Sequence, residues 1–363
     1  MLILSPAEIP VADAEWLAKA RTEIDSKTKP PGSLGRLEEV AIRLCVLQQT
    51  LSPSVEKGKI LLFAADHGLA DEGVSQYPKI VTQEMLRNLA NGGAAINAFC
   101  NANGLGLEVI DVGVDTALVF EGITRQKDAS PHGTQSSLQG LAMTQEQFDN
   151  AVQAGYDAVD RAIREGHQAI GIGELGIGNT ATAAALLAAE SGLAGSRVTG
   201  RGTGVDDQGL ERKTKIVDGV VEKHQDLIRT GDWTQIFRAL GGLEIVAMAA
   251  AARRAALNRL VLIVDGFISM AAFLYALKVY PEDRAAFYRS AFFSHQSSEQ
   301  GVVVAMERID QLLGESGRSA PLLNLGFRLG EGTGAAVAFP LLRAAAHMAS
   351  DMATFASAGV SEA

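Results

Sequence analysis

The sequence predicts an α/β fold: a Rossmann-like, mostly parallel sheet with helices on both faces, plus a small helical domain. Short apolar runs that end at glycine or an acid recur along the chain, at 60–65, 107–110, 169–172 and 260–264. Longer alanine-rich segments with helical periodicity follow such runs, as at 181–190 and 268–278. Strands that alternate with helices favour parallel pairing, and ligands then bind beyond the carboxyl ends of the strands.

The domain organisation follows from length and from the two chain ends. A chain of 363 residues suggests two domains at about 150 residues each. Helical patterns occupy both ends of the chain, at 13–23, 37–49, 297–313 and 334–355. We therefore expect residues 1–50 and 282–363 to form the small helical domain and residues 51–281 the large one. Segment 320–334, a strand followed by a glycine loop, should return to the site of the large domain, and segment 115–141 should be a long loop.

Composition and charge exclude several classes of protein. With 47% hydrophobic residues and 10 prolines, the chain can build a core and is not a disordered chain. Its 42 acidic and 32 basic residues give a net charge of -10, which disfavours nucleic acid as a partner. Cys45 and Cys100 lie far apart, which indicates buried thiols in a reducing compartment.

Targeting and membrane signals are weak in this sequence. Residues 1–16 have no basic region of the secretory type, so we expect a cytoplasmic protein. Asp265 and Gly266 interrupt the most apolar stretch, 260–277, and a spanning helix would bury that charge in lipid. We therefore expect no membrane association, and a strand, a turn and a helix in this stretch.

Three glycine-rich loops each precede a predicted helix. The 38 glycines are about one residue in ten, against a usual ~7%. They cluster in the sequences GIGELGIGNT from Gly171, GRGTG from Gly200 and LGFRLGEGTG from Leu325. Glycine permits a positive φ and close approach of backbone N–H groups to a ligand, and a helix amino terminus favours an anion. The loops therefore predict a local phosphate site, although tight structural turns would explain any one of them.

The run Gly171 to Gly176 also matches the GxGxxG dinucleotide motif, with Glu190 near the position of its ribose-binding acid. A dehydrogenase is therefore a competing hypothesis. Against it, Gly171 lies inside the apolar run, and Glu174 would direct a carboxylate towards a pyrophosphate.

Two glutamates are candidates for acid–base chemistry. Glu331 stands between glycines just before an alanine-rich segment, so its carboxylate is free to face a ligand as a general base. Glu174 has the same character in its own loop. The alternative for each is a solvated turn glutamate or one placed favourably at a helix start. Asp66, His67 and Asp265 follow predicted strands and should lie at the mouth of the sheet.

A metal centre is not expected, because the six histidines show no HxH or HExxH spacing. His67 is expected to orient the site through hydrogen bonds, and His295 stands beside polar loop residues. Lys213 and Arg201 are the cations best placed for an anionic substrate, although a solvated helical turn explains either one. Ser75 and Gln83 offer neutral polar groups for an uncharged heteroaromatic ligand, or simple caps.

Several motifs in order along nearly the whole chain resemble a known family. They are KPPGSLGRLE from Lys29, FAADHG from Phe63, GVSQYP from Gly73, NGGAAINAF from Asn91, GIGELGIGNT from Gly171, GRGTGVDD from Gly200, VDGF from Val264, SHQSSEQG from Ser294 and LGEGTGAA from Leu329. In these the chain resembles the nicotinate-nucleotide:dimethylbenzimidazole phosphoribosyltransferases of cobalamin nucleotide-loop synthesis. The carboxyl tail after Ala349 carries no such motif.

The resemblance implies an enzyme that moves phosphoribose from nicotinate mononucleotide to 5,6-dimethylbenzimidazole, with Glu331 as general base and Glu174 assisting. It also implies a homodimer and no cofactor. The implied substrate-binding residues are Ser75 and Gln83 at the benzimidazole, Gly176, Ile177, Gly178, Asn179, Thr180 and Lys213 at the phosphate, Asp265 and Phe267 near nicotinate, and Gly202 and Leu329. The preferred acceptor stays open among benzimidazoles, purines and phenols, and a non-catalytic relative of the fold stays an alternative.

Overall fold

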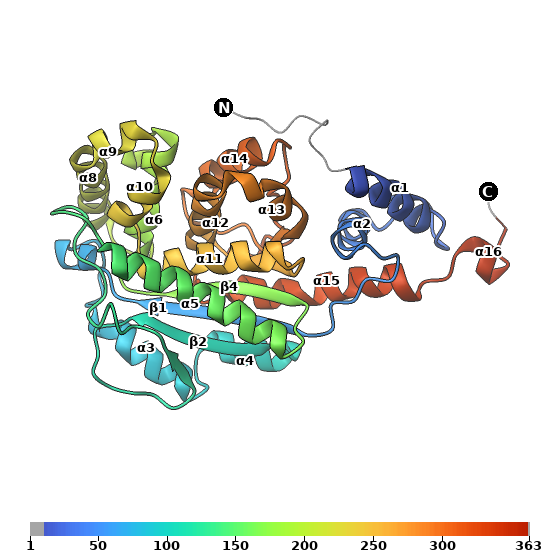
Figure 1. Ribbon diagram of the computed structural model, residues 1–363, viewed down its shortest axis with the longest axis horizontal. Helices are drawn as coiled ribbons and strands as arrows, with labels where there is room; N and C mark the ends of the chain where they lie inside the picture. The colour runs from blue at the N-terminus through green and yellow to red at the C-terminus, as the bar shows by residue number, and fades with distance from the viewer. Residues whose placement is uncertain (1–10, 362–363) are drawn as a thin grey trace.

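The computed structural model describes residues 11–361 and confirms the predicted α/β fold. One sheet holds six strands in the order β3-β2-β1-β4-β5-β6, and every neighbouring pair is parallel (Figure 1). The strands are β1 Gly58–Ala65, β2 Gly106–Gly113, β3 Ile123–Arg125, β4 Ala169–Leu175, β5 Val261–Val264 and β6 Ala291–Phe293. β1 and β4 lie at the centre of the sheet, so the sheet is doubly wound around them.

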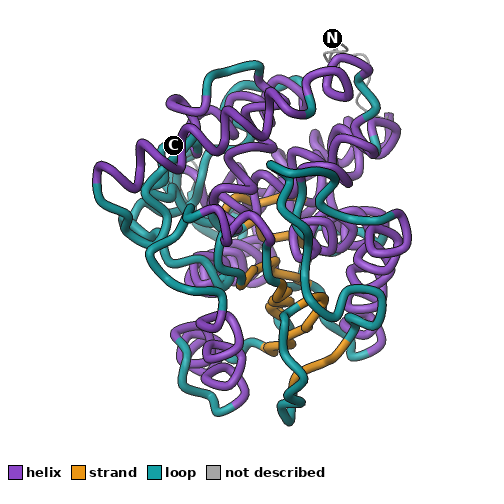
Figure 2. Tube along the Cα trace, turned by 90° about the vertical axis from the view of Figure 1, so that its left-hand side faces the viewer, coloured by secondary structure: helices purple, strands orange, loops and turns teal. Residues whose placement is uncertain are grey.

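The helices of the described chain cover both faces of this sheet. They are α1 Val11–Asp25, α2 Arg36–Gln48, α3 Ile80–Ala90, α4 Ala95–Asn103, α5 Gln145–Arg164, α6 Asn179–Ser191, α7 Gly195–Val198, α8 Asp207–Lys223, α9 Gln225–Thr230, α10 Trp233–Leu240, α11 Leu243–Leu257, α12 Phe267–Val279, α13 Arg284–Ser290, α14 Val302–Leu313, α15 Thr333–Asp351 and α16 Phe355–Ala358, with short 3-10 turns η2 Gly68–Glu72 and η3 Pro281–Asp283. Figure 2 shows helices on either side of the strands, with loops on the side facing the viewer.

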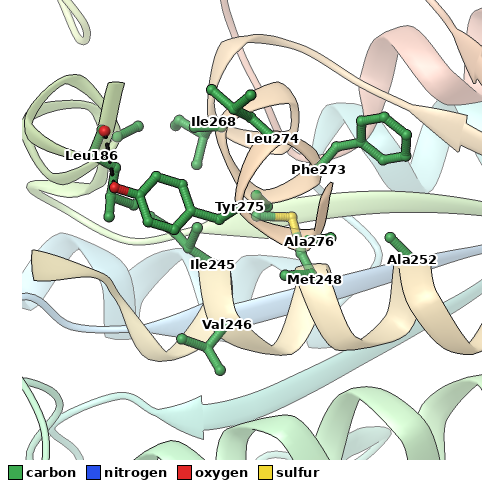
Figure 3. Packing of buried hydrophobic residues seen from close by; sticks show 14 of the residues in the cluster. Leu186, Ile245, Val246, Met248, Ala252, Ile268, Phe273, Leu274, Tyr275 and Ala276 are labelled. Carbon is green, nitrogen blue, oxygen red and sulfur yellow. Dashed lines mark hydrogen bonds between the residues drawn. The ribbon is translucent and has the colours of Figure 1, made fainter. Parts of the chain in front are cut away.

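The core lies in two layers because side chains alternate along each strand. In β1, Leu61 and Phe63 face a cluster shared with α5, α6, α11 and α12, whereas Ile60 and Leu62 face a cluster shared with α2, α4 and α15. In the first layer the Tyr275 hydroxyl donates to the Leu186 carbonyl at 3.0 Å (Figure 3). Small alanines let α11 pack closely on its neighbours, and the result is a rigid platform under the carboxyl ends of the strands.

The first described helices, α1 and α2, pack in one group with α15, which lies near the carboxyl end. α1 packs on α2, and α2 packs on α15, at the right of Figure 1. Lys27 and Thr354 form an antiparallel bridge, and Arg289 pairs with Asp13 at 2.7 Å. α15 also contacts β1, β4 and β5, while α14 packs on α12. The division into two domains stays a prediction.

Three sequence-based expectations differ from the structure in detail. The helix expected from residue 297 begins at Val302, because residues 296 and 298 form backbone hydrogen bonds to the 323–327 segment. The long loop 115–141 contains strand β3, which is only three residues long and gives no periodic signal. The strand expected within 320–334 is reduced to a single bridge at Leu323. Within residues 11–361, no helix combines the length and apolar content that crossing a bilayer requires. Residues 1–10, which carry most of the signal-peptide argument, lie outside the described residues.

Candidate active site

A cavity of about 750 Å³ opens beyond the carboxyl ends of β4 and β5. The strand order reverses direction between β1 and β4, and in doubly wound sheets ligands bind at that point. The cavity is lined by the end of β4, the loop before α6, the start of α12 and residues from α3, α4 and the segments 202–203, 295–299 and 327–333. Segments distant in sequence therefore converge where the topology favours a site.

Glu331 lies on a strained turn at the cavity wall. Its φ is +61°, between Gly330 at +85° and Gly332 at +77°, so three successive residues are left-handed. Glutamate rarely adopts this conformation, and such strain often marks a functional residue. The side chain is buried, and its Oε2 has no hydrogen-bond partner among the described residues. Burial raises the pKa of Glu331 above its usual range, partly offset by a hydrogen bond from the backbone of Ile96.

Asp265 holds this turn in place. It follows β5, and its carboxylate accepts the N–H of Gly332 at 3.2 Å and of Ala335 at 3.0 Å. It thereby satisfies backbone donors at the start of α15, the helix that follows Glu331. Burial raises the pKa of Asp265, and the nearby His295, with Nε2 at 3.6 Å, opposes that rise. Asp265 is thus a buried anchor behind the cavity wall.

Glu174 lies at the end of β4 and faces the same cavity. Its side chain is buried, and Asn179 donates a hydrogen bond to its Oε2. A Cβ on Gly330 would collide with this carboxylate, which explains why glycine stands there. Burial, with repulsion from Glu244 and Asp265, raises the pKa of Glu174 to about 8. Glu174 is therefore mostly protonated at neutral pH.

The loop after β4 has the geometry of an anion site. Gly178 has a φ of +100° at the amino terminus of α6, and Thr180 follows in the first turn. Lys213 of α8 is buried beside it and donates to Thr180 Oγ1 at 2.8 Å and to the Gly200 carbonyl at 3.1 Å. A Cβ on Gly202 would lie 2.7 Å from that hydroxyl, so the second glycine loop closes directly over this point. Burial lowers the pKa of Lys213 to about 8.

The two arginines near these loops differ. Arg201, a sequence candidate, is held within its own loop, donating to the Val205 carbonyl at 2.9 Å and to Asp207 at 2.5 Å. Arg328, which the sequence reasoning missed, lines the cavity and donates to the Gly202 carbonyl at 3.3 Å. Its place three residues before Glu331 was the available signal.

One wall of the cavity is apolar. Tyr77, Val81, Met85 and Phe99 contribute from α3, α4 and the loop before α3. Ser75 and Gln83 are half-buried nearby but lie outside the lining residues, and Ser75 Oγ contacts Thr203 Oγ1 at 3.4 Å. Val81 and Met85 share a helix face at a spacing of four, a sequence signal that would have found them. This wall suits a flat apolar ring.

Some of the remaining residues predicted from the sequence line the cavity, and others lie outside its lining. The cavity is lined by Glu174 and Glu331 together with Gly176, Ile177, Asn179, Thr180, Gly202, Phe267 and Leu329. Three other candidates are not among the lining residues: Gly178, Lys213 and Asp265. His67 donates or accepts at Glu244 Oε1 (2.7 Å) and Thr182 Oγ1 (2.9 Å), so it links α6 to α11. Across residues 11–361, no three His, Cys, Asp or Glu side chains gather as a metal site would require.

Known proteins share this chain's sequence and fold. Residues 9–360 match a family described as Phosphoribosyltransferase. A nicotinate-nucleotide–dimethylbenzimidazole phosphoribosyltransferase of Cupriavidus taiwanensis is 42% identical over 357 residues, 98% of each chain, and one of a Geobacter species is 41% identical over 355 residues, 98% of this chain and 97% of its own. The chain belongs to this phosphoribosyltransferase family. The crystal structure of CobT from Thermus thermophilus matches with a TM-score of 0.87 at 42% identity, over 96% of this chain and 100% of that one.

Membership makes this phosphoribosyltransferase an enzyme of the pentosyltransferase class and removes the dehydrogenase hypothesis. The structure gives the same result independently. Gly171 and Gly173 lie inside β4 rather than in a turn after it. Glu190 is buried at the far end of α6, where Arg308 pairs with it at 2.8 Å and Lys278 at 3.3 Å. The GxGxxG match is thus a strand packed against Ile60 and the Glu331 turn, and Glu190 is not a ribose-binding acid.

Proposed function

We propose that this enzyme moves the 5-phosphoribosyl group from nicotinate mononucleotide to 5,6-dimethylbenzimidazole or a related base. The products are α-ribazole 5′-phosphate and nicotinate. The observation that carries the proposal is the pairing of two unlike glutamates at one cavity. Glu331 lies on a strained turn with its Oε2 free of any hydrogen bond from the described residues, and the pKa of Glu174, raised to about 8, favours the protonated form of that side chain. The relatives' names describe this same pair of substrates.

The reaction needs a base more than an acid. The benzimidazole nitrogen attacks C1′, and the C1′–N bond to nicotinate breaks with its electron pair remaining on the pyridine nitrogen. Nicotinate therefore leaves with a neutral ring nitrogen and needs no proton. The attacking ring must also lose the proton carried by its second nitrogen, and this proton passes to the Glu331 carboxylate. Attack from the face opposite nicotinate inverts C1′ from β to α.

The surrounding groups support this assignment of roles. Backbone N–H groups of Gly176 to Thr180, with Gly202 and Lys213, would hold the phosphate. Ser75 and Gln83 would stand behind the apolar α3–α4 wall that receives the acceptor base, with Leu329 opposite. Asp265 and Phe267 lie at the start of α12, where the nicotinate would depart.

The proposal is tested by incubating the purified protein with nicotinate mononucleotide and dimethylbenzimidazole, then separating the products by chromatography and mass. α-Ribazole 5′-phosphate and nicotinate are expected in equal amounts. A mixture of benzimidazoles, purines and phenols then ranks the acceptors. Absence of transfer to every base at neutral pH would refute the proposal.

We also propose that the enzyme is a cytoplasmic homodimer. Tyr77 and Leu329, at the rim of the cavity, are each at least half exposed, and a second copy of the chain packed there would cover both apolar side chains together. Light scattering during size-exclusion chromatography should give twice the chain mass of 38.2 kDa. A mass of one chain at micromolar concentration would contradict the dimer.

A further inference from the structure

The segment before α14 presents alternate side chains to the cavity. Gln296 N–H donates to the Leu323 carbonyl at 2.8 Å, and Ser298 N–H donates to the Phe327 carbonyl at 3.1 Å, so this stretch lies beside 323–327. Burial alternates along it, because the residues at 295, 297 and 299 are buried whereas the residue at 298 is exposed. The odd-numbered residues His295, Ser297 and Glu299 all line the cavity, and we call them the polar row.

The polar row carries hydrogen-bonding capacity that the described protein leaves unused. His295 is 1% exposed and Glu299 is 9% exposed. Within the described chain, His295 Nδ1 and Glu299 Oε2 are buried without a hydrogen-bond partner, as is Oε2 of the candidate base Glu331. A buried polar atom left unpaired costs about 1–3 kcal/mol, so a native protein rarely keeps one without a reason. A ligand that fills the cavity would supply the missing partners.

The row runs from the base to the phosphate site. At one end, a Cβ on Gly266 would crowd the His295 ring, and a Cβ on Gly334 would collide with it, close to the Glu331 turn. At the other end, Glu299 packs so closely on Gly200 that a Cβ there would collide with its carboxylate. The Gly200 carbonyl in turn accepts from Lys213. The row therefore connects the two ends of a phosphorylated sugar.

The charge of the row selects the group that binds it. Glu299 would repel an anion from the row itself, and its charge also acts on the neighbouring Lys213, which is the cation of the phosphate site. Sugar hydroxyls are neutral and donate hydrogen bonds, and a carboxylate can accept from them, as acids do at the ribose of dinucleotides. Ser297 and His295 can each donate or accept. The chemistry of the row thus matches vicinal hydroxyls rather than either anionic group of the substrate.

We propose that the polar row binds the ribose hydroxyls, and that Glu299 makes the enzyme select ribose over deoxyribose substrates. This inference rests on the proposed function, because it needs a phosphoribosyl substrate lying between Glu331 and Lys213. A hydrogen bond to a charged group is worth about 1.5–3 kcal/mol, which corresponds to about tenfold to a hundredfold in selectivity.

The test compares kcat/KM for nicotinate mononucleotide with that for its 2′-deoxy and 3′-deoxy analogues. The wild type should prefer the ribonucleotide over at least one analogue by about tenfold or more, beyond any difference in intrinsic reactivity. Glu299→Ala should reduce that preference by about tenfold, and Glu299→Gln, which retains one acceptor, should give an intermediate ratio. Intrinsic reactivity is the same in every variant, so it cancels when the ratios are compared. Thermal unfolding confirms that each variant is folded.

A matched pair of neighbouring serines provides the control. Ser297 belongs to the row, whereas Ser298 faces away, with its exposed hydroxyl 3.4 Å from the Gly326 carbonyl. Ser297→Ala should lower selectivity about threefold and Ser298→Ala should not change it. If Glu299→Ala slows all three substrates equally, Glu299 is only structural and the inference is wrong.

Direct binding separates this inference from the proposed function. Calorimetry with ribose 5-phosphate and 2-deoxyribose 5-phosphate needs no transfer reaction. Tighter binding of ribose 5-phosphate that is lost in Glu299→Ala would support the row even if no transfer to any base were observed. Equal affinities for the two sugars, together with equal kinetics for 2′- and 3′-deoxy substrates, would overturn it.

Discussion

Glu174 and Glu331 face one cavity from two unlike pieces of backbone. Glu174 ends a regular buried strand, is hydrogen-bonded by Asn179, and has a pKa raised to about 8 by burial and by Glu244 and Asp265. Glu331 lies on a left-handed turn, where burial also raises its pKa but the backbone of Ile96 opposes the rise. The difference shows that surroundings, not residue type, assign the roles. One glutamate is kept neutral and the other is left free to accept a proton.

Removing the proton acceptor should give the largest effect. We expect Glu331→Gln to lower kcat by about 10²–10⁴-fold, the usual contribution of a general base. The amide has nearly the same shape, so the dissociation constant for nicotinate mononucleotide, measured by calorimetry, should stay within about threefold. A kcat within threefold of the wild type would show that Glu331 is not the base.

Removing Asp265, which anchors the Glu331 turn, should rank second. Asp265→Ala leaves the N–H groups of Gly332 and Ala335 without their acceptor, so the Glu331 turn should shift. Small displacements of catalytic groups cost up to about 10²-fold, so we expect kcat to fall by about tenfold to a hundredfold. The free energy of unfolding should fall by about 2–4 kcal/mol, as measured by denaturant titration.

A second readout separates anchoring from general destabilisation. The charge of Asp265 raises the pKa of Glu331, so the acid limb of the kcat profile should move to lower pH in Asp265→Ala. Asp265→Asn keeps an acceptor for the backbone and should retain more of the stability. An acid limb unchanged in Asp265→Ala would contradict this electrostatic link.

The sequence predicted the loops of this site better than its contacts. Glycine spacing identified the turns that carry Glu174 and Glu331, because glycine adopts a positive φ, as at Gly330 and Gly332, far more readily than other residues. Four of the six strands are long apolar runs and were found, whereas β3 and β6 have three residues each. The path of 295–299 depends on backbone hydrogen bonds to 323–327, which no local pattern encodes. Arg328 and the approach of Glu244 to Glu174 are likewise products of tertiary packing.

Replacing Glu174 with glutamine should have a smaller effect on turnover than replacing Glu331. Glutamine mimics a protonated glutamate, so we expect kcat of Glu174→Gln to stay within about tenfold of the wild type at pH 7. In the wild type, kcat should fall above pH 8 as Glu174 ionises, and Glu174→Gln should lack that fall. Lys213 also has a pKa of about 8, so it loses its positive charge above pH 8, and KM should rise there in both proteins. A basic limb in kcat that persists in Glu174→Gln would assign it to another group.

The last expected effect concerns stability rather than turnover, as a pH-dependent difference between Glu174→Gln and the wild type. The folded pKa of Glu174, about 8, exceeds its unfolded value of 4.5. Between these values the folded protein keeps a proton that the unfolded chain has released. Its contribution to stability is therefore full below pH 4.5 and is lost as pH rises through 8. Glutamine does not titrate, so the free energy of unfolding of the variant should rise relative to that of the wild type by at most about 1.4 kcal/mol per pH unit in this window.

A glutamate outside the cavity supplies the control of opposite sign. Burial acts to raise the pKa of Glu38, but hydrogen bonds from Leu34, Lys29 and Gly32 outweigh it and hold that pKa below its usual value. Glu38 therefore stabilises the fold above pH 4.5, and that contribution is lost as pH falls through its lowered pKa. Urea titrations at pH 4, 5, 7 and 9 give the free energy of unfolding of each variant relative to the wild type. This difference should be least favourable at high pH for Glu38→Gln and most favourable there for Glu174→Gln. Parallel curves for the two variants would mean that Glu174 is ionised in the folded enzyme, and its contrast with Glu331 would then have to come from position alone.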